Sequence, residues 1–267
     1  MTEARAGCRW AGGDTFLISL HCRILDNLRS NPVVRDEKAV SIGRAVGYDF
    51  EQLSIPRVTV IATSLRVKKF DREARSFLGR HPAGTVVNIG CGLETRSFRL
   101  DNGLADWIDL DLPEVIEERR KHFPETDRHL SLGISAIDIE WMESIRQRDP
   151  EKVLFLGEGV FMFFPERQAK TLVLALQERF RGSELIFDTC SPWVAARSRR
   201  RPFLKTKESG FLWGLKNGRD IERWNDGLRL IEEWFYFDQA DRDLGWYQAL
   251  SYIPAVRGMF RILRLAL

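Results

Sequence analysis

The sequence predicts an α/β fold in which helices cover both faces of a mostly parallel sheet. Four short apolar runs, at residues 85–89, 107–110, 153–156 and 184–187, have the length and composition of buried strands. Segments with apolar residues at helical spacing alternate with these runs. Strands that alternate with amphipathic helices indicate βαβ units, whose strands run parallel.

The chain length and composition favour one large domain with distinct regions. It has 267 residues, of which 44% are hydrophobic and 30% charged, so it can bury a sizeable core. We expect a helical N-terminal cap at 14–80 and a ligand-binding core at 84–190. Residues 191–226, rich in arginine and aromatic side chains, interrupt the alternation and predict an insertion. Residues 227–267 would then supply the last strands as an antiparallel pair.

Charge and cysteine usage argue against several classes of protein. The 41 basic and 38 acidic residues nearly cancel, whereas a nucleic-acid-binding protein usually concentrates basic charge. No apolar run approaches the roughly 18 residues of a membrane span, and the polar start does not resemble a secretory signal. The four cysteines and four histidines are scattered, which predicts free thiols, no metal site and a cytoplasmic protein.

A glycine pair gives the first indication of a ligand. Residues 86–96 read VVNIGCGLETR, so a strand runs into Gly90 and Gly92 and a helix begins soon after. Glycines in such a turn let the backbone approach a ligand, although many turns carry them for steric reasons alone. The dinucleotide fingerprint requires a third glycine where this chain has Thr95, which disfavours a pyrophosphate ligand and a nicotinamide oxidoreductase.

An acidic pair, Asp109 and Asp111, ends the next strand about twenty residues further on. A carboxylate at this position can accept hydrogen bonds from ribose hydroxyls. The structural alternative for Asp111 is a cap on the helix that begins at Pro113. The two features together favour a nucleoside ligand that lacks a pyrophosphate, and S-adenosylmethionine is the obvious one.

Several motifs, taken in order, resemble the leucine carboxyl methyltransferase family, in particular its bacterial branch. They are VRDEKAV at 34–40, the glycine turn, WIDLDLPEVI at 107–116 and LGEGVFMFFPE at 156–166. The resemblance implies a Rossmann-like class I methyltransferase sheet with an antiparallel last strand. It also implies that S-adenosylmethionine is the cofactor and S-adenosylhomocysteine the product.

The same resemblance assigns roles in holding the methionine part of the cofactor. Arg66, in SLRVKKFD at 64–71, matches the arginine that binds the methionine carboxylate, a suitable partner for a guanidinium group. Gly90 and Gly92 would admit the methionine part. Glu158, at the end of the fourth core strand, would attract the methionine amine, and its apolar surroundings require a partner if it is buried.

The resemblance also assigns residues to the nucleoside. Asp111 would hold the ribose, and we include Asp109 in the same cofactor site. Asp138 and Ile139, in SAIDIE at 135–140, match a segment that contacts adenine. For Asp138, a cap on the helix that follows is an equally good interpretation.

The acceptor is expected to be a small molecule that carries a carboxylate or a phenol. A carboxylate is ionised at pH 7 and needs no general base, whereas a phenol, with a pKa near 10, does. Phe163 stands where the family commonly has tyrosine, and the insertion supplies Trp193, Phe203 and Trp213 as the expected wall of a lidded acceptor pocket. Two alternatives stay open: these aromatic residues complete the core, or the protein binds the cofactor without catalysis.

Overall fold

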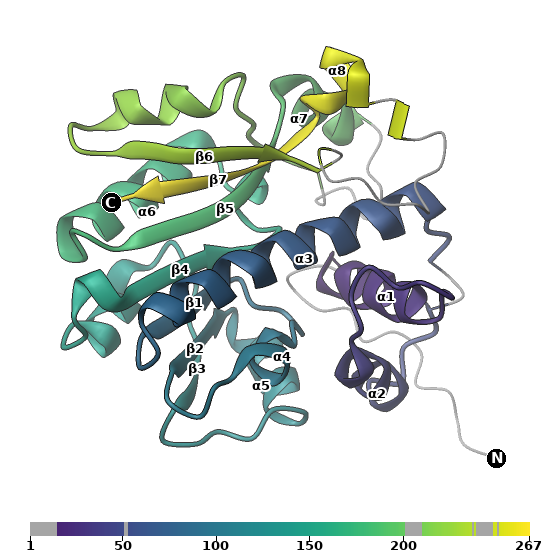
Figure 1. Ribbon diagram of the computed structural model, residues 1–267, viewed down its shortest axis with the longest axis horizontal. Helices are drawn as coiled ribbons and strands as arrows, with labels where there is room; N and C mark the ends of the chain where they lie inside the picture. Colours follow the sequence, from purple (N-terminus) through teal and green to yellow (C-terminus); the bar gives the residue numbers. More distant parts are fainter. Residues whose placement is uncertain (1–14, 51–52, 201–209, 237, 239–247, 250) are drawn as a thin grey trace.

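A computed structural model describes residues 15–50, 53–200, 210–236, 238, 248–249 and 251–267. Its centre is a seven-stranded sheet in the order β3-β2-β1-β4-β5-β7-β6 (Figure 1). The strands are β1 (Thr85–Ile89), β2 (Asp106–Asp111), β3 (His129–Gly133), β4 (Val153–Gly157), β5 (Glu184–Cys190), β6 (Arg229–Phe235) and β7 (Phe260–Ala266).

The strand directions confirm the predicted sheet. Strands β1 to β5 pair in parallel, and β7 lies antiparallel between β5 and β6. The four runs predicted as buried strands are β1, β2, β4 and β5. Strand β3 is an addition to the prediction. It pairs with β2 at the edge of the sheet, and only Ser131 of its five residues is buried, so it lacks a continuous apolar pattern.

The helices cover the sheet on both faces. They are α1 (Thr15–Asn27), α2 (Glu37–Ala45), α3 (Arg57–Arg80), α4 (Arg96–Leu100), α5 (Pro113–Arg120), α6 (Glu166–Arg179), α7 (Pro192–Arg200) and α8 (Pro254–Arg257). Short 3-10 helices are η2 (Ile139–Ile145), η3 (Pro150–Lys152), η4 (Phe161–Phe163) and η5 (Gly218–Trp224). Within the described ranges, no helix is both long enough and apolar enough to cross a membrane.

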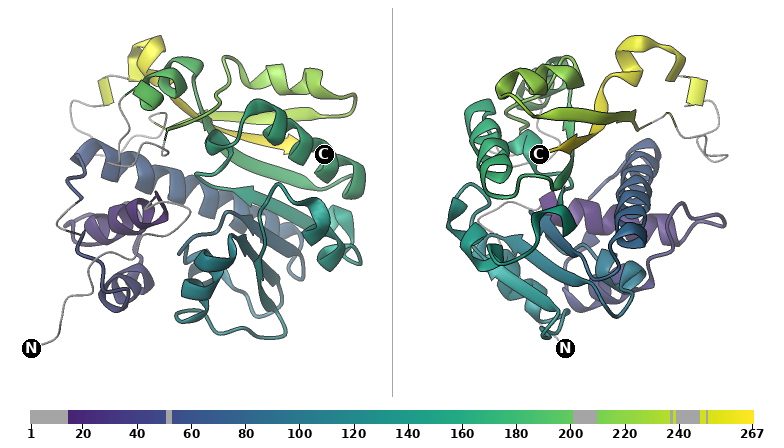
Figure 2. Two further views of the ribbon diagram at one scale, coloured as in Figure 1. Left: turned by 180° about the vertical axis from the view of Figure 1, so that it is seen from behind. Right: turned by 60° about the vertical axis from the view of Figure 1, so that its left-hand side comes forward.

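Two hydrophobic clusters follow from the alternation of side chains along the strands. Helix α3 packs Leu65 and Phe70 against Val86 and Leu154 on one face of the sheet. Helix α6 covers the opposite face of the sheet (Figure 2). There it packs with Val87 and with other strand residues whose side chains point to that face. The long helix α3 is therefore an integral layer of the core, with Pro56 at its N-cap.

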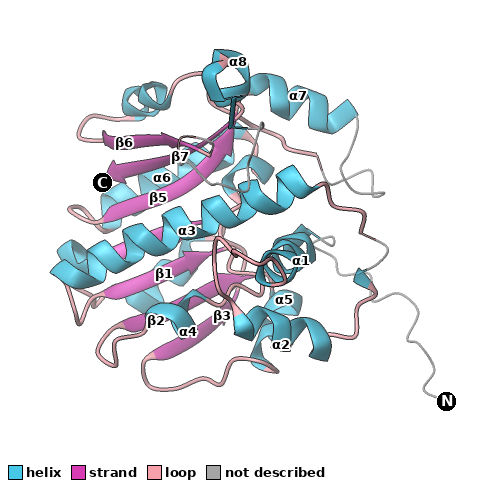
Figure 3. Cartoon of the chain, turned by 45° about the vertical axis from the view of Figure 1, so that its right-hand side comes forward, coloured by secondary structure: helices cyan, strands magenta, loops and turns pink. Residues whose placement is uncertain are grey.

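Helices α1 and α2 lie beside the carboxyl ends of the parallel strands (Figure 3). Leu17 and Leu20 of α1 and Ile42 of α2 form a third cluster with Leu93, which follows β1. The N-terminal helices thereby cover the edge of the sheet at which α/β folds of this kind bind ligands.

Candidate functional site

The candidate residues meet at the carboxyl edge of the sheet because β1, β2 and β4 run parallel. Gly92, after β1, donates its backbone N–H to Asp111 at the end of β2, at 2.7 Å. Arg66 reaches the same edge from α3, and its Nε donates to Glu158 Oε1 at 3.1 Å. The structure thus forms two groups, Gly92 with Asp111 and Arg66 with Glu158, on neighbouring strand ends.

The glycine turn has a conformation that favours glycine at both positions. Gly90 and Gly92 have φ angles of 66° and 48°, in the left-handed region. A Cβ atom at Gly90 would lie 2.7 Å from Val160 Cγ2, and one at Gly92 would lie 3.0 Å from Phe16 Cβ. The loop after β4 and helix α1 therefore pack directly onto the turn, which fixes its position relative to Glu158 and the N-terminal helices.

Asp111 faces the glycine turn and does not cap the following helix. Its second oxygen accepts the backbone N–H of Leu112 at 2.8 Å. The N-cap of α5 is Leu112, which makes no side-chain capping bond, so the capping interpretation of Asp111 is wrong. Burial is the main cause that raises the pKa of Asp111, partly opposed by the hydrogen bond from Gly92.

Asp111→Asn should weaken binding of S-adenosylhomocysteine by about 1.5–3 kcal/mol, the scale of a lost charged hydrogen bond. The asparagine oxygen can still accept the Gly92 N–H, and only the hydrogen bond from the Leu112 N–H is lost, so we expect a small change in melting temperature. Calorimetric titration and thermal unfolding measure the two effects. A large loss of stability with normal affinity in the folded protein would assign Asp111 a structural role.

Asp109 has a different role from the one predicted. It is wholly buried, and its carboxylate accepts from Asn88 at 2.7 Å, from Arg119 Nη2 at 2.6 Å and from His129 Nε2 at 2.5 Å. Burial would raise its pKa, but Arg119 and His129 hold the pKa below its usual value. Because Asp109 is 0% exposed whereas Asp111 is only half-buried, we correct the assignment of Asp109 to the cofactor site: it joins β2 to α5 and β3.

Asp138 and Ile139 lie at the start of η2. The exposed Asp138 is its N-cap, and its carboxylate accepts the backbone N–H of Glu140 at 3.4 Å, as the capping interpretation predicts. Ile139 is half-buried against the main hydrophobic cluster. A contact of these two residues with adenine stays a prediction.

Glu158 has the partner that its apolar surroundings require, and in fact it has two. Its Oε1 accepts from Arg66 Nε, and its Oε2 accepts from Arg96 Nη2 at 2.5 Å. The Glu158 side chain is 7% exposed and that of Arg66 is 13% exposed. The pair is therefore largely shielded from water, and its charges are only weakly screened.

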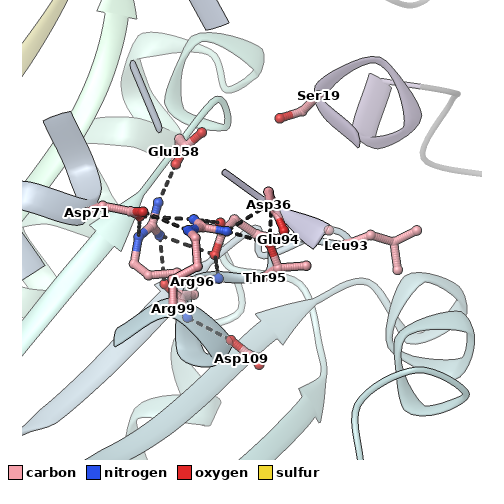
Figure 4. A network of polar contacts seen from close by, with 12 residues as sticks. Ser19, Asp36, Asp71, Leu93, Glu94, Thr95, Arg96, Arg99, Asp109 and Glu158 are labelled. Atoms are coloured by element: carbon pink, nitrogen blue, oxygen red, sulfur yellow. Dashed lines mark hydrogen bonds and ion pairs between the residues drawn. The ribbon is translucent and has the colours of Figure 1, made fainter. Parts of the chain in front are cut away.

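A buried network of ion pairs extends from Glu158 toward the N-terminal helices (Figure 4). Arg96 also donates to Asp71 at 2.9 Å, and Arg99 donates to Asp71 at 2.7 Å and to Glu94 at 2.7 Å. Arg99 Nη1 continues the network to Asp36, at the N-terminus of α2. The network joins α2, α3, α4 and the glycine turn around the candidate site.

Thr95, where a dinucleotide site would have its third glycine, belongs to this network. Its hydroxyl donates to Asp36 Oδ2 at 2.5 Å and accepts from Arg23 Nη1 at 2.8 Å. Arg23 also donates to the Leu93 carbonyl at 2.9 Å. Helix α1 is thus tied directly to the glycine turn.

Three residues near Arg66 were missed by the sequence analysis. Arg96 follows the glycine turn closely enough to suggest a site role, but its partners come from distant segments. Asp188 of β5 accepts a hydrogen bond from Tyr236, which follows β6, and both lie beside Arg66. No local pattern pairs residues 48 positions apart, so only the fold reveals them.

The aromatic residues proposed for the acceptor pocket separate into different environments. Phe163 is half-buried and meets Phe211 edge to face, with ring centroids 5.2 Å apart. Trp193 of α7 is 58% exposed and lies under the Arg197 guanidinium. Phe203 lies outside the described residues. A pocket lined by Phe163 and Trp193 stays a prediction.

Trp213 is a core residue, which corrects its assignment to the acceptor pocket. It is 6% exposed and belongs to the main hydrophobic cluster on the α6 face of the sheet. Its ring packs on Trp224, with centroids 5.6 Å apart. The alternative that the insertion completes the core is therefore correct for this residue.

Known proteins resemble the chain over most of its length. Residues 18–177 match the family described as Leucine carboxyl methyltransferase. The chain is 30% identical over 258 residues to the tetracenomycin polyketide synthesis O-methyltransferase TcmP of Streptomyces glaucescens, which covers 94% of this chain and 95% of that protein. It is 28% identical over 259 residues to the S-adenosyl-L-methionine-dependent methyltransferase dpfgK of Gibberella zeae, with 87% and 86% covered.

Solved structures share the fold at low sequence identity. A DUF574 family protein from Streptomyces avermitilis has a TM-score of 0.58 and 13% identity, covering 92% of this chain and 96% of that chain. The N-methyltransferase NodS from Bradyrhizobium japonicum, solved with S-adenosyl-L-homocysteine, has a TM-score of 0.50 and 13% identity, covering 86% and 98%. The predicted class I methyltransferase fold is confirmed. The chain belongs to the leucine carboxyl methyltransferase family, whose methyltransferases depend on S-adenosylmethionine, and this confirms both the resemblance and the cofactor predicted from the sequence.

Proposed function

We propose that the protein is an O-methyltransferase that esterifies a carboxylate of a small molecule, with a role in secondary metabolism. The observation that carries the proposal is the 30% identity to TcmP, an O-methyltransferase, over 94% of this chain. A phenol is the alternative acceptor.

The described residues fit S-adenosylmethionine by their chemistry. Arg66 provides a guanidinium for the methionine carboxylate, and Glu158, 3.1 Å away, provides an anion for the amine. Asp111 provides acceptors for the ribose hydroxyls beside the glycine turn. When bound, the cofactor supplies a methyl group on a positively charged sulfur.

The protein's part in the reaction is to bind, orient and exclude water. Transfer of a methyl group to an oxygen is an in-line displacement, so alignment of the acceptor oxygen contributes much of the rate. The N-terminal helices α1 and α2 cover the carboxyl edge of the sheet and would separate the reacting groups from solvent. The partly shielded pair of Arg66 and Glu158 holds the charged end of the cofactor there.

Two histidines that could act as a base are already bonded to carboxylates: His122 to Glu118 and His129 to Asp109. His81 packs on Phe77, and His21 stacks on Phe50 with its buried Nδ1 lacking a hydrogen-bond partner among the described residues. A carboxylate acceptor is ionised at neutral pH and needs no general base, whereas a phenol would require one.

Incubation with methyl-labelled S-adenosylmethionine and matched pairs of acids and phenols tests the proposal. We expect the label in the methyl ester of an acid. Mild alkali should release this label as volatile methanol, because alkali cleaves the ester. Label that is stable to alkali would identify ether formation and refute the carboxylate acceptor. Binding of S-adenosylhomocysteine without transfer to any acid or phenol in the panel would favour a protein that binds the cofactor without catalysis.

A further inference from the structure

The guanidinium of Arg66 is held on several sides. Its Nε donates to Glu158 at 3.1 Å, its Nη1 to Asp188 Oδ2 at 3.4 Å and its Nη2 to Ser19 Oγ at 3.4 Å. Gly159 lies against its plane: a Cβ atom there would lie 3.2–3.4 Å from the guanidinium atoms. Few orientations of the Arg66 side chain satisfy all of these contacts.

Asp188 is the innermost of these partners. It is wholly buried in β5, and its carboxylate accepts the backbone N–H of Gly159 as well as donors from Arg66 and Tyr236. The contact with Gly159 fixes the loop after β4, on which the Arg66 guanidinium rests. Asp188 therefore holds both the guanidinium and the surface beneath it.

Tyr236, which directly follows β6, completes the arrangement. It is 4% exposed, its ring stacks on Phe260 with centroids 5.3 Å apart, and its hydroxyl donates to Asp188. The same hydroxyl lies beside Arg66 and interacts with it electrostatically. Tyr236 thus links the rigid sheet to both charged groups.

The charges near Arg66 are balanced only because other donors take part. One guanidinium cannot neutralise the carboxylates of both Glu158 and Asp188. Arg96 provides the second cation for Glu158, while the Tyr236 hydroxyl and the Gly159 N–H stabilise Asp188. Without these donors, the excess negative charge would repel an anionic ligand from Arg66.

We propose that Asp188 and Tyr236 are positioning residues that hold Arg66 for the carboxylate of the cofactor. The inference rests on the proposed function, which assigns Arg66 to that carboxylate. Asp188 and Tyr236 act through Arg66, because both are almost wholly buried whereas the Arg66 side chain is 13% exposed.

A double-mutant cycle on the binding of S-adenosylhomocysteine tests the proposal without any acceptor. Tyr236→Phe should raise the dissociation constant roughly 5–20-fold, as expected when a charged hydrogen-bond network loses one donor. Arg66→Ala should raise it about 10–150-fold, and the double variant should match Arg66→Ala within about twofold. The matched control is Tyr252→Phe at a tyrosine that is 84% exposed, which should bind normally.

Independent, fully multiplicative effects of Tyr236→Phe and Arg66→Ala would overturn the proposal, as would normal affinity in Tyr236→Phe. Asp188→Asn provides a second cycle, with the same loss of effect expected in the Arg66→Ala background. In the active enzyme, Tyr236→Phe should raise KM for the cofactor and leave KM for the acceptor within about twofold, which a general loss of structure would not do. A wild-type protein that binds no S-adenosylhomocysteine would refute the proposed function itself, and the inference with it.

Discussion

Replacing Arg96 with alanine should lower the free energy of unfolding by about 3–5 kcal/mol at neutral pH, the usual cost of leaving buried charges unpaired. The Arg96 side chain is 1% exposed and donates to Asp71 and Glu158, with Glu94 3.6 Å away. Its removal would leave these carboxylates short of positive charge in a medium that screens poorly. Denaturant unfolding measures the loss.

The loss should depend on pH in a defined direction. Burial alone would raise the pKa of Glu94, but Arg96 and Arg99 together hold it well below its usual range. A carboxyl with a lowered pKa in the folded state stabilises the protein above its unfolded pKa of about 4.3, and this contribution is lost as the pH falls. The difference between wild type and Arg96→Ala should therefore be largest near pH 7 and shrink below about pH 4.

The control for Arg96→Ala is Arg146→Ala. Arg146 is 71% exposed and forms a surface pair with Glu143, so its loss should cost less than about 1 kcal/mol at any pH. An Arg96→Ala deficit below about 1 kcal/mol, or one that is the same at about pH 2 and pH 7, would show that the network does not stabilise the fold in this way.

Trp213→Ala should also destabilise the protein by about 3–5 kcal/mol, because it leaves a large cavity beside Trp224 in the main hydrophobic cluster. Trp193→Ala is the matched variant on the same predicted insertion. Since Trp193 is 58% exposed, we expect its loss to cost about 1 kcal/mol or less. Thermal and denaturant unfolding of both variants give the comparison. Similar stability of the two variants would show that Trp213 is not a core residue.

The sequence predicted those parts of the fold that have a strong local pattern. β1, β2, β4 and β5 are recognisable because strands covered on both faces are continuously apolar. β3 is an edge strand with mixed exposure, and its sequence gives no such signal. Helix α3 has the predicted periodicity, but periodicity alone could not show that it packs on the sheet as a core layer.

The candidate site was predictable only as far as local motifs reach. The positive φ angles follow from the glycine pair after β1. The position of Asp111 beside that turn follows from its place at the end of the neighbouring parallel strand β2. Asp109 differs from Asp111 because Arg119 and His129 cover it, and these contacts exist only in the folded chain. Tertiary contacts of this kind also assigned Trp213 to the core.

The role of Arg66 in the cofactor site is tested most directly by calorimetric titration of S-adenosylhomocysteine into wild-type and Arg66→Ala protein. We expect wild type to bind and Arg66→Ala to lose about 1.5–3 kcal/mol of binding free energy, as expected for a lost charged hydrogen-bond pair. The folded state of the variant is checked by thermal unfolding. Unchanged affinity in a folded Arg66→Ala protein would contradict the assignment of Arg66 to the cofactor site.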